Sequence, residues 1–185
     1  MIRYYVSQTV HALVYVSDSI FIGLKVVVPL FFIAWIINLF LKKIELKLFV
    51  SSLQWLMICA GILFLLAISS NTFLAWYSGN EDEKEMIISF ATGPHWYQFF
   101  TPLFNYAILP IILWLRFMRR NIYALFVIVL LWYVTTYVVE AVNHARGFNA
   151  MEPDIGESIN KMIVFLVAFI FIFLIVRYKA IRKGV

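Results

Sequence analysis

The sequence predicts an all-α fold: a polytopic bundle of about five transmembrane helices, in a single domain that covers residues 1–185. Hydrophobic residues make up 64% of the chain and charged residues only 14%, whereas soluble domains average about half apolar and a quarter charged. The mean hydropathy is +0.91. Five segments are apolar over the roughly 20 residues that a helix needs to cross a bilayer, and basic and acidic connections alternate between them.

Each of the five segments is expected to form one membrane-spanning helix: residues 20–41, 49–75, 97–117, 122–143 and 160–178. In the first of them, Pro29 is expected to kink the helix, because proline cannot donate the i→i−4 hydrogen bond. Lys25 also lies in this segment, and its long stem is expected to carry the ammonium to the membrane interface. Residues 1–18 are amphipathic at best and are expected to lie along the interface.

The charges between the spans predict the topology. Segments 41–47 and 116–121 and the C-terminal tail are basic, whereas segments 79–85 and 144–160 are acidic on balance. Lysine and arginine concentrate on the cytoplasmic side of membrane proteins, so we expect the N-terminus outside, the C-terminus in the cytoplasm, and the acidic segments as solvated outer loops. Because the basic residues lie in short clusters beside apolar runs, the net charge of +5 does not indicate a nucleic-acid partner.

The fourth predicted span carries the most polar face. Its members share three- and four-residue spacing, which puts them on one side of a helix: Tyr133, Thr136, Tyr137, Glu140 and His144. Polar groups inside a membrane are costly and need a reason. One interpretation is a proton relay to the outer surface through Glu140, His144 and Tyr137. The other is a Glu–His or Glu–Arg pair that fastens the helix end to a neighbour.

A second group of candidates lies where the third span begins. Gly93 and Pro94 are expected to form a turn, and aromatic residues from Trp96 onward an interfacial belt. His95 is expected beside the emerging His144. Asn105 is a candidate for a hydrogen bond between helices. These residues need no bound ligand for their explanation.

The positions of the histidines argue against a haem, and the spacing of the potential ligands argues against a metal site. His11, His95 and His144 all map to the outer edge, whereas a bis-histidine haem b needs two imidazoles that face each other inside the bundle. No His, Cys and carboxylate cluster has the spacing of metal ligands. We therefore expect no metal and disfavour haem b.

Four short motifs in residues 71–146 resemble, in order and spacing, one half of the polysulfide reductase/NrfD-type membrane subunits, and most closely the large membrane subunits of alternative complex III. They are "FLAWYSGN" (73–80), "GPHWYQFF" (93–100), "LPIILWLRFMRRN" (109–121) and "YVVE" (137–140). The resemblance implies a bacterial inner-membrane protein in a quinol-oxidising complex with an extracytoplasmic iron–sulfur or cytochrome subunit. Glu140 matches an embedded carboxylate of the family's second bundle that serves proton movement.

The chain departs from this family in length, since it is about half as long and matches the second bundle, whereas the quinol pocket belongs chiefly to the first. We therefore expect an accessory subunit of a quinone-linked respiratory complex that packs against larger membrane subunits. The alternative is a small redox subunit that binds quinol or haem b itself; His95, Trp96 and Asn105 are then the candidates for a quinone site. A transporter or channel is disfavoured, because no inverted repeat is present.

Overall fold

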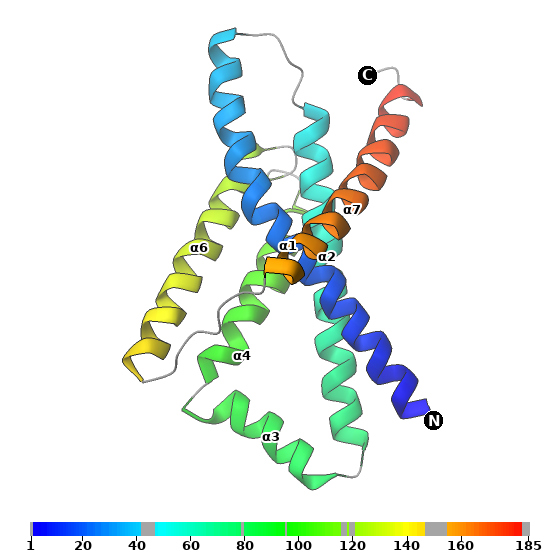
Figure 1. Ribbon diagram of the computed structural model, residues 1–185, viewed down its shortest axis with the longest axis vertical. Coiled ribbons are helices and arrows are strands. Elements are labelled where there is room, and N and C mark those ends of the chain that lie inside the picture. Colours follow the sequence, from blue (N-terminus) through cyan, green and yellow to red (C-terminus); the bar gives the residue numbers. More distant parts are fainter. Residues whose placement is uncertain are drawn as a thin grey trace.

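The computed structural model describes residues 2–41, 47–78, 80–94, 96–115, 118, 121–146 and 155–182. Within these ranges every regular element is helical. In chain order the elements are α1 (Ile2–Leu41), α2 (Lys47–Tyr77), α3 (Glu81–Thr92), α4 (Trp96–Pro102), the π-helix η1 (Leu103–Ile108), α5 (Leu109–Ile112), α6 (Ile122–Ala145) and α7 (Ile155–Arg182). Figure 1 shows their arrangement.

Four helices in the described part of the chain are long and apolar enough to cross a membrane. Their candidate spans are Gln8–Ile37, Lys47–Tyr77, Ile122–Ala145 and Gly156–Arg182. Each exceeds the roughly 20 residues that a bilayer requires. The prediction of an all-helical chain is therefore confirmed for the described residues, and four of its helices could span a membrane. The third predicted span, residues 97–117, is instead α4, η1 and α5 in succession and its helix ends at Ile112, so the count of five stays a prediction.

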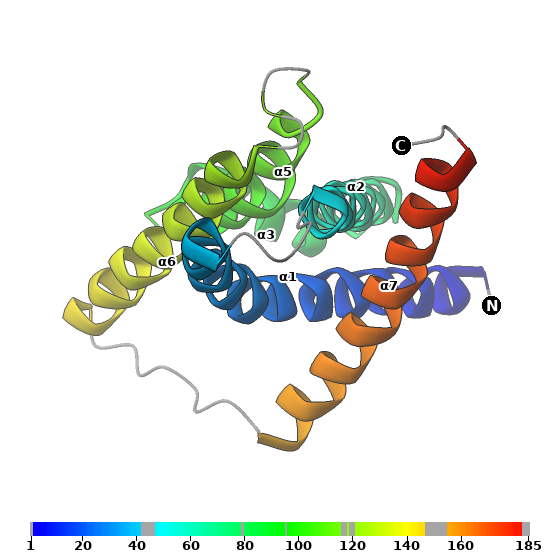
Figure 2. The same cartoon turned by 90° about the horizontal axis from the view of Figure 1, so that it is seen from above.

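The first helix is longer than the sequence indicated. Residues 2–18, expected as a separate interfacial segment, continue directly into the first predicted span, and α1 has 40 residues with Pro29 inside it. Figures 1 and 2 show that α1 changes direction along its length. A proline within a helix removes one backbone bond and its ring crowds the preceding turn, which bends the helix.

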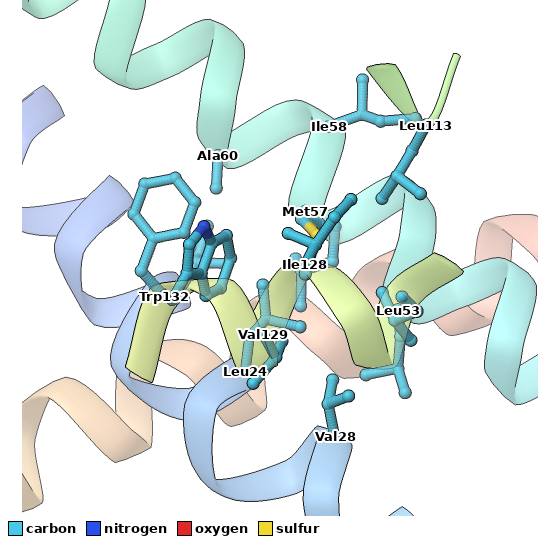
Figure 3. Close-up of a cluster of buried hydrophobic side chains, with 14 of the residues drawn as sticks. Leu24, Val28, Leu53, Met57, Ile58, Ala60, Leu113, Ile128, Val129 and Trp132 are labelled. Atoms are coloured by element: carbon cyan, nitrogen blue, oxygen red, sulfur yellow. The ribbon is translucent and has the colours of Figure 1, made fainter. Parts of the chain in front are cut away.

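The core lies around α2, which contacts α1, α7, η1 and α5. Figure 3 shows side chains of α1, α2 and α6 meeting there, among them Leu24, Met57 and Trp132. Small residues of α2 let its neighbours come close: a Cβ added at Gly61 would lie 2.8 Å from the Cβ of Pro110. Close backbone approach at small residues is the usual basis of helix packing in membranes.

Opposite charges gather at opposite ends of the molecule. Figure 1 places the end of α1, the start of α2 and the end of α7 at one end, and α3 at the other. Basic residues of the last turn of α7 belong to the first end, and α3 begins with Glu81, Asp82 and Glu83. The orientation relative to a membrane stays a prediction.

The acidic segment is a helix rather than the expected loop. Asn80 caps α3, because its side-chain oxygen accepts a hydrogen bond from the backbone N–H of Asp82 at 3.1 Å. Carboxylates in the first turn of a helix also interact favourably with its positive N-terminal dipole end. The acidic run that indicated a solvated loop is therefore also a helix-start pattern, which the sequence argument missed.

The last helix packs on α1 and α2 and leaves most of its remaining surface exposed. Lys161 of α7 makes ion pairs with Asp18 of α1 at 2.6 Å and with Glu157 at 2.7 Å. Further along, a Cβ at Gly23 would collide with the ring of Phe165, so the two helices touch there. Only 6% of the span of α7 is buried inside the chain. Its remaining apolar surface faces outward.

Candidate functional site

A pocket lies between the helical segment α4–η1 and the C-terminal half of α6. Its volume is about 270 Å³, and its lining residues are Tyr97, Gln98, Thr101, Pro102, Asn105, Tyr106, Thr136, Val139 and Glu140. Most of these residues carry polar side chains, although the helices around them are apolar. A concave site with convergent polar groups is the default candidate for binding or transfer chemistry.

The π-helix that forms one wall follows from Pro110. The backbone N–H of Leu109 donates to the carbonyl of Phe104, five residues back. In this register the next donor would be Pro110, which has no N–H. The carbonyl of Asn105 therefore lacks a donor from its own helix, and the indole N–H of Trp132 on α6 donates to it at 2.7 Å. Short π segments of this kind are frequent at functional sites.

Pro29 creates a second free carbonyl in the same way. In an α-helix the N–H of residue 29 would bond to the carbonyl of Lys25, and proline cannot supply it. The hydroxyl of Tyr133 on α6 donates to that carbonyl at 2.9 Å. Two successive residues of α6 thus satisfy two carbonyls that prolines leave open on neighbouring helices, which is how membrane bundles tolerate proline.

Asn105 lines the pocket and carries a buried, unsatisfied oxygen. The residue is 2% exposed, and its amide nitrogen donates to the hydroxyl of Thr135 at 2.6 Å. Thr135 directs its own proton to the carbonyl of Leu131, so it acts as the acceptor and the amide orientation is fixed. The amide oxygen Oδ1 is buried and has no hydrogen-bond partner in the described part of the chain. A buried acceptor without a donor costs about 1–3 kcal/mol.

The ammonium of Lys25 bonds to a neighbouring helical segment. The residue lies near the middle of the candidate span Gln8–Ile37 and is half-buried. Its ammonium donates to the hydroxyl of Tyr106 at 3.0 Å and lies 5.4 Å from the centre of that ring. The phenol oxygen of Tyr106 on η1 lies close to Lys25 and accepts a hydrogen bond from the ammonium.

Aromatic rings hold Tyr106 in place. The ring of Phe21 stacks on it with centroids 4.7 Å apart. Phe64 and Trp132 meet it edge-on at 5.6 and 5.8 Å. Ring pairs in these geometries are worth about 0.5–1.5 kcal/mol each beyond their buried area. The Tyr106 ring is therefore held among side chains of α1, α2 and α6, and its hydroxyl is bonded to Lys25.

The C-terminal end of α6 is fastened to the start of α4. Asn143 accepts hydrogen bonds from the Tyr97 hydroxyl at 2.9 Å and from Gln98 at 3.2 Å. The guanidinium of Arg146 donates to the carbonyl of Pro94 at 3.0 Å and lies 5.2 Å from the centre of the Tyr97 ring. Asn143 and Arg146 therefore do the fastening that the sequence argument gave to a pair with Glu140.

The structure brings only some of the predicted residues together. Glu140 and Asn105 line the same pocket. Tyr137 is 68% exposed and His144 is also exposed, and neither is among the lining residues. Trp96 is 55% exposed and packs with Phe100. His95 lies outside the described residues.

Sequence reasoning missed Tyr106, Tyr97 and Gln98 as members of the site. For Tyr106 the prolines were the available indication, since Pro102 and Pro110 flank the segment that supplies it. The link to Lys25 spans 81 positions and leaves no local pattern. In the described residues no group of three or more His, Cys, Asp and Glu side chains is placed to hold a metal ion.

Comparison with models of protein families, with characterised proteins and with solved structures gives no match for this chain. The resemblance of residues 71–146 to the NrfD-type subunits therefore stays an expectation.

Proposed function

We propose that this chain is an integral membrane subunit of a quinone-linked electron-transfer complex in the bacterial inner membrane, where it packs against larger membrane subunits and carries protons. The observation on which this rests most is the pocket, because it combines the Glu140 carboxylate with the buried, unsatisfied oxygen of Asn105. Ionisable groups within apolar spans are retained mainly where they serve ion or proton pathways. The four aromatic-rich motifs add the link to quinone.

The outward surfaces support partners as well as lipid. Large apolar side chains cover the outer faces of α6 and α7, such as Leu130, Val134, Val167 and Phe171, all at least 49% exposed. These faces suit either lipid tails or the larger membrane subunits of the complex. At the other end α3 presents Glu81, Asp82 and Glu85. In the proposed orientation this acidic surface lies where an extracytoplasmic iron–sulfur or cytochrome subunit would dock.

Purification of the tagged full-length chain in a mild detergent tests this proposal. We expect larger membrane subunits and a redox subunit to come with it, and the purified assembly to oxidise a quinol. A chain that purifies alone, folded and monomeric, from its native membrane would contradict the proposal. An absorbance spectrum of the same sample reports whether a haem is present and in which component.

Asn105 favours a second candidate function, in which the pocket itself holds the head group of a quinol. The hydroxyl of a hydroquinone is a hydrogen-bond donor, which is what the buried Oδ1 of Asn105 lacks. Ligand pockets range from about 300 to 1,000 Å³, so a pocket of about 270 Å³ suits a head group whose tail stays in the membrane. The exposed Trp96 would then contact the tail rather than the ring.

Substitution of Asn105 separates this candidate from a purely structural role. Asn105→Leu removes the acceptor while it keeps the side-chain volume close to the original. If the pocket binds a quinol, titration with a short-chain hydroquinone analogue should show binding to the wild type and not to this variant. Thr135→Val removes only the partner of the amide nitrogen and serves as the control. Equal binding to wild type and Asn105→Leu would exclude the pocket as the quinol site.

A further inference from the structure

Lys25 lies in the middle of an apolar helix, and its ammonium bonds to a neutral residue. The Tyr106 hydroxyl accepts a hydrogen bond from the ammonium at 3.0 Å. The titratable groups that meet Lys25 are Tyr106 of η1 and Tyr133 of α6, and Tyr133 bonds to its backbone carbonyl. In the described part of the chain no carboxylate pairs with Lys25. A charged side chain inside an apolar span is costly and is therefore retained mainly where it serves a function.

Tyr106 connects this charge with the pocket. Its ring is held by Phe21, Phe64 and Trp132, and the residue lines the pocket. A tyrosine hydroxyl accepts one hydrogen bond while its own proton remains free to donate. Here the acceptor side is taken by Lys25, so the hydroxyl proton can point away from it. Tyr106 can therefore accept a hydrogen bond from Lys25 and at the same time donate its hydroxyl proton to another group.

The pocket can complete the connection with water. Its volume of about 270 Å³ is several times the roughly 30 Å³ that one water occupies in the liquid. Asn105 lines one wall, and Glu140 supplies a carboxylate on the opposite helix. A chain of pocket water can thus join the Tyr106 hydroxyl to the Glu140 carboxylate.

We infer that Lys25 and Tyr106 form the inner end of a proton path whose outer end is Glu140. The Lys25 ammonium gives a proton to the Tyr106 oxygen as the Tyr106 hydroxyl proton passes to pocket water, and the water chain delivers a proton to the Glu140 carboxylate. The products are a neutral amine and a neutral carboxylic acid. The reverse sequence recharges Lys25. No separated charge is left in the apolar layer, where it would be least stable.

The path gives the proposed proton role a defined route, and its physiological use rests on the proposed function. It replaces the earlier expectation of a relay along one face of α6, since Tyr137 and His144 do not line the pocket. The competing explanation is that the Lys25–Tyr106 bond only fastens α1 to η1. The two explanations differ in what happens when the Tyr106 hydroxyl is removed. If the pair is a relay, the proton then loses its route from the ammonium to the pocket. If the bond only holds α1 to η1, the ammonium is instead released from that bond.

Deuterium exchange at the Lys25 ammonium distinguishes them. The full-length chain is labelled with ¹⁵N at the lysine side chains, reconstituted in lipid and transferred to D₂O, and the Lys25 resonance is assigned with Lys25→Arg. In Tyr106→Phe, exchange should be about a hundredfold slower, the lower end of what a positioned proton donor contributes. Tyr133→Phe, which alters only the bond to the Lys25 carbonyl, should exchange like the wild type. Unchanged or faster exchange in Tyr106→Phe would overturn the inference.

A second variant covers the case in which Tyr106→Phe fails to fold. Val139→Phe fills the pocket from α6 and leaves Lys25 and Tyr106 intact. It should also slow exchange at Lys25, and exchange at the wild-type rate would equally overturn the inference. These measurements use the chain alone. Co-purification of a redox complex can therefore succeed or fail independently of them.

Discussion

At the scale of single residues, prolines explain most of the site. Pro29 and Pro110 each remove one backbone donor, and Tyr133 and Trp132 of α6 supply the replacements. The prolines could be read from the sequence, and a kink at Pro29 was expected. The partners could not, because residues 25 and 133 are 108 positions apart and no local pattern links them.

The first prediction concerns the hydrogen bond that Tyr133 donates to the Lys25 carbonyl, which Pro29 leaves free. Tyr133→Phe removes the hydrogen bond to the Lys25 carbonyl and should lower the free energy of unfolding by about 1 kcal/mol, the usual net value of such a bond. In a Pro29→Ala background residue 29 regains its N–H and can satisfy that carbonyl, so the same change should then cost close to nothing. Unfolding in mixed micelles with increasing sodium dodecyl sulfate, followed by circular dichroism, measures both.

The control for this cycle is Tyr123→Phe, on the same helix and 55% exposed. It should change stability equally little with proline or alanine at residue 29. A cost of Tyr133→Phe that is the same in both backgrounds would contradict the account of the free carbonyl.

Glu140 gives the second prediction. It is exposed within this chain, and it makes no ion pair with another residue of the described ranges. Glu140→Gln keeps its shape and removes its titration, so the amount of assembled complex should stay the same while proton movement per quinol oxidised should fall. Quantitative purification and a pH-indicator assay on the same preparations measure the two quantities.

The opposite result has a distinct meaning. Loss of the assembled complex with Glu140→Gln would show that the carboxylate pairs with a group on a partner subunit, since breaking a desolvated pair costs about 3–5 kcal/mol. That outcome would contradict the proton role. Thr136→Val, in the same pocket but without a titratable group, is the matched control.

At the scale of elements, hydropathy predicted the long helices and failed at their ends and breaks. Composition alone indicated helices near α2, α6 and α7, because each is a long apolar run. It did not show that residues 2–41 are one helix or that residues 97–117 contain a π segment. Those features depend on contacts across the bundle. Asn80 and the acidic turn that follows it indicate the start of α3. A search for apolar segments does not find this helix, because its hydropathy is low.

The contact of α2 with α5 and η1 gives the third prediction. A Cβ at Gly61 would lie 2.8 Å from the Cβ of Pro110 and 3.2 Å from the carbonyl oxygen of Tyr106. Neither neighbour can turn away, because one is a proline ring and the other is backbone. Gly61→Ala should therefore lower the free energy of unfolding by about 1–3 kcal/mol, as overpacking typically does. The same micelle titration checks it.

Ala34→Val, at an exposed position of α1, controls for the added volume and should be neutral. A neutral Gly61→Ala would show that η1 and α5 do not pack on α2 as described, and the wall of the pocket would then be wrongly placed.

At the scale of the whole molecule, charge divides the chain into two ends. The expected alternation of basic and acidic connections corresponds in space to α3 at one end and the last turn of α7 at the other (Figure 1). The pocket lies toward the end that carries α3, where Tyr97 and Gln98 meet Asn143. The sequence predicted this division because charge placement in membrane proteins is a local property of each connection.

The central claim is that the pocket opens toward the outer, acidic end of a membrane-embedded chain. Cysteine labelling with an impermeant thiol reagent tests it most directly, in a Cys59→Ala background and in membranes of both orientations. Cysteines at Thr101, in the pocket, and at Asn80, at the acidic end, should react only with reagent on the outer side, and one at Lys179 only with reagent on the cytoplasmic side. A Thr101 cysteine that reacts only from the side of Lys179, or not at all, would contradict the account.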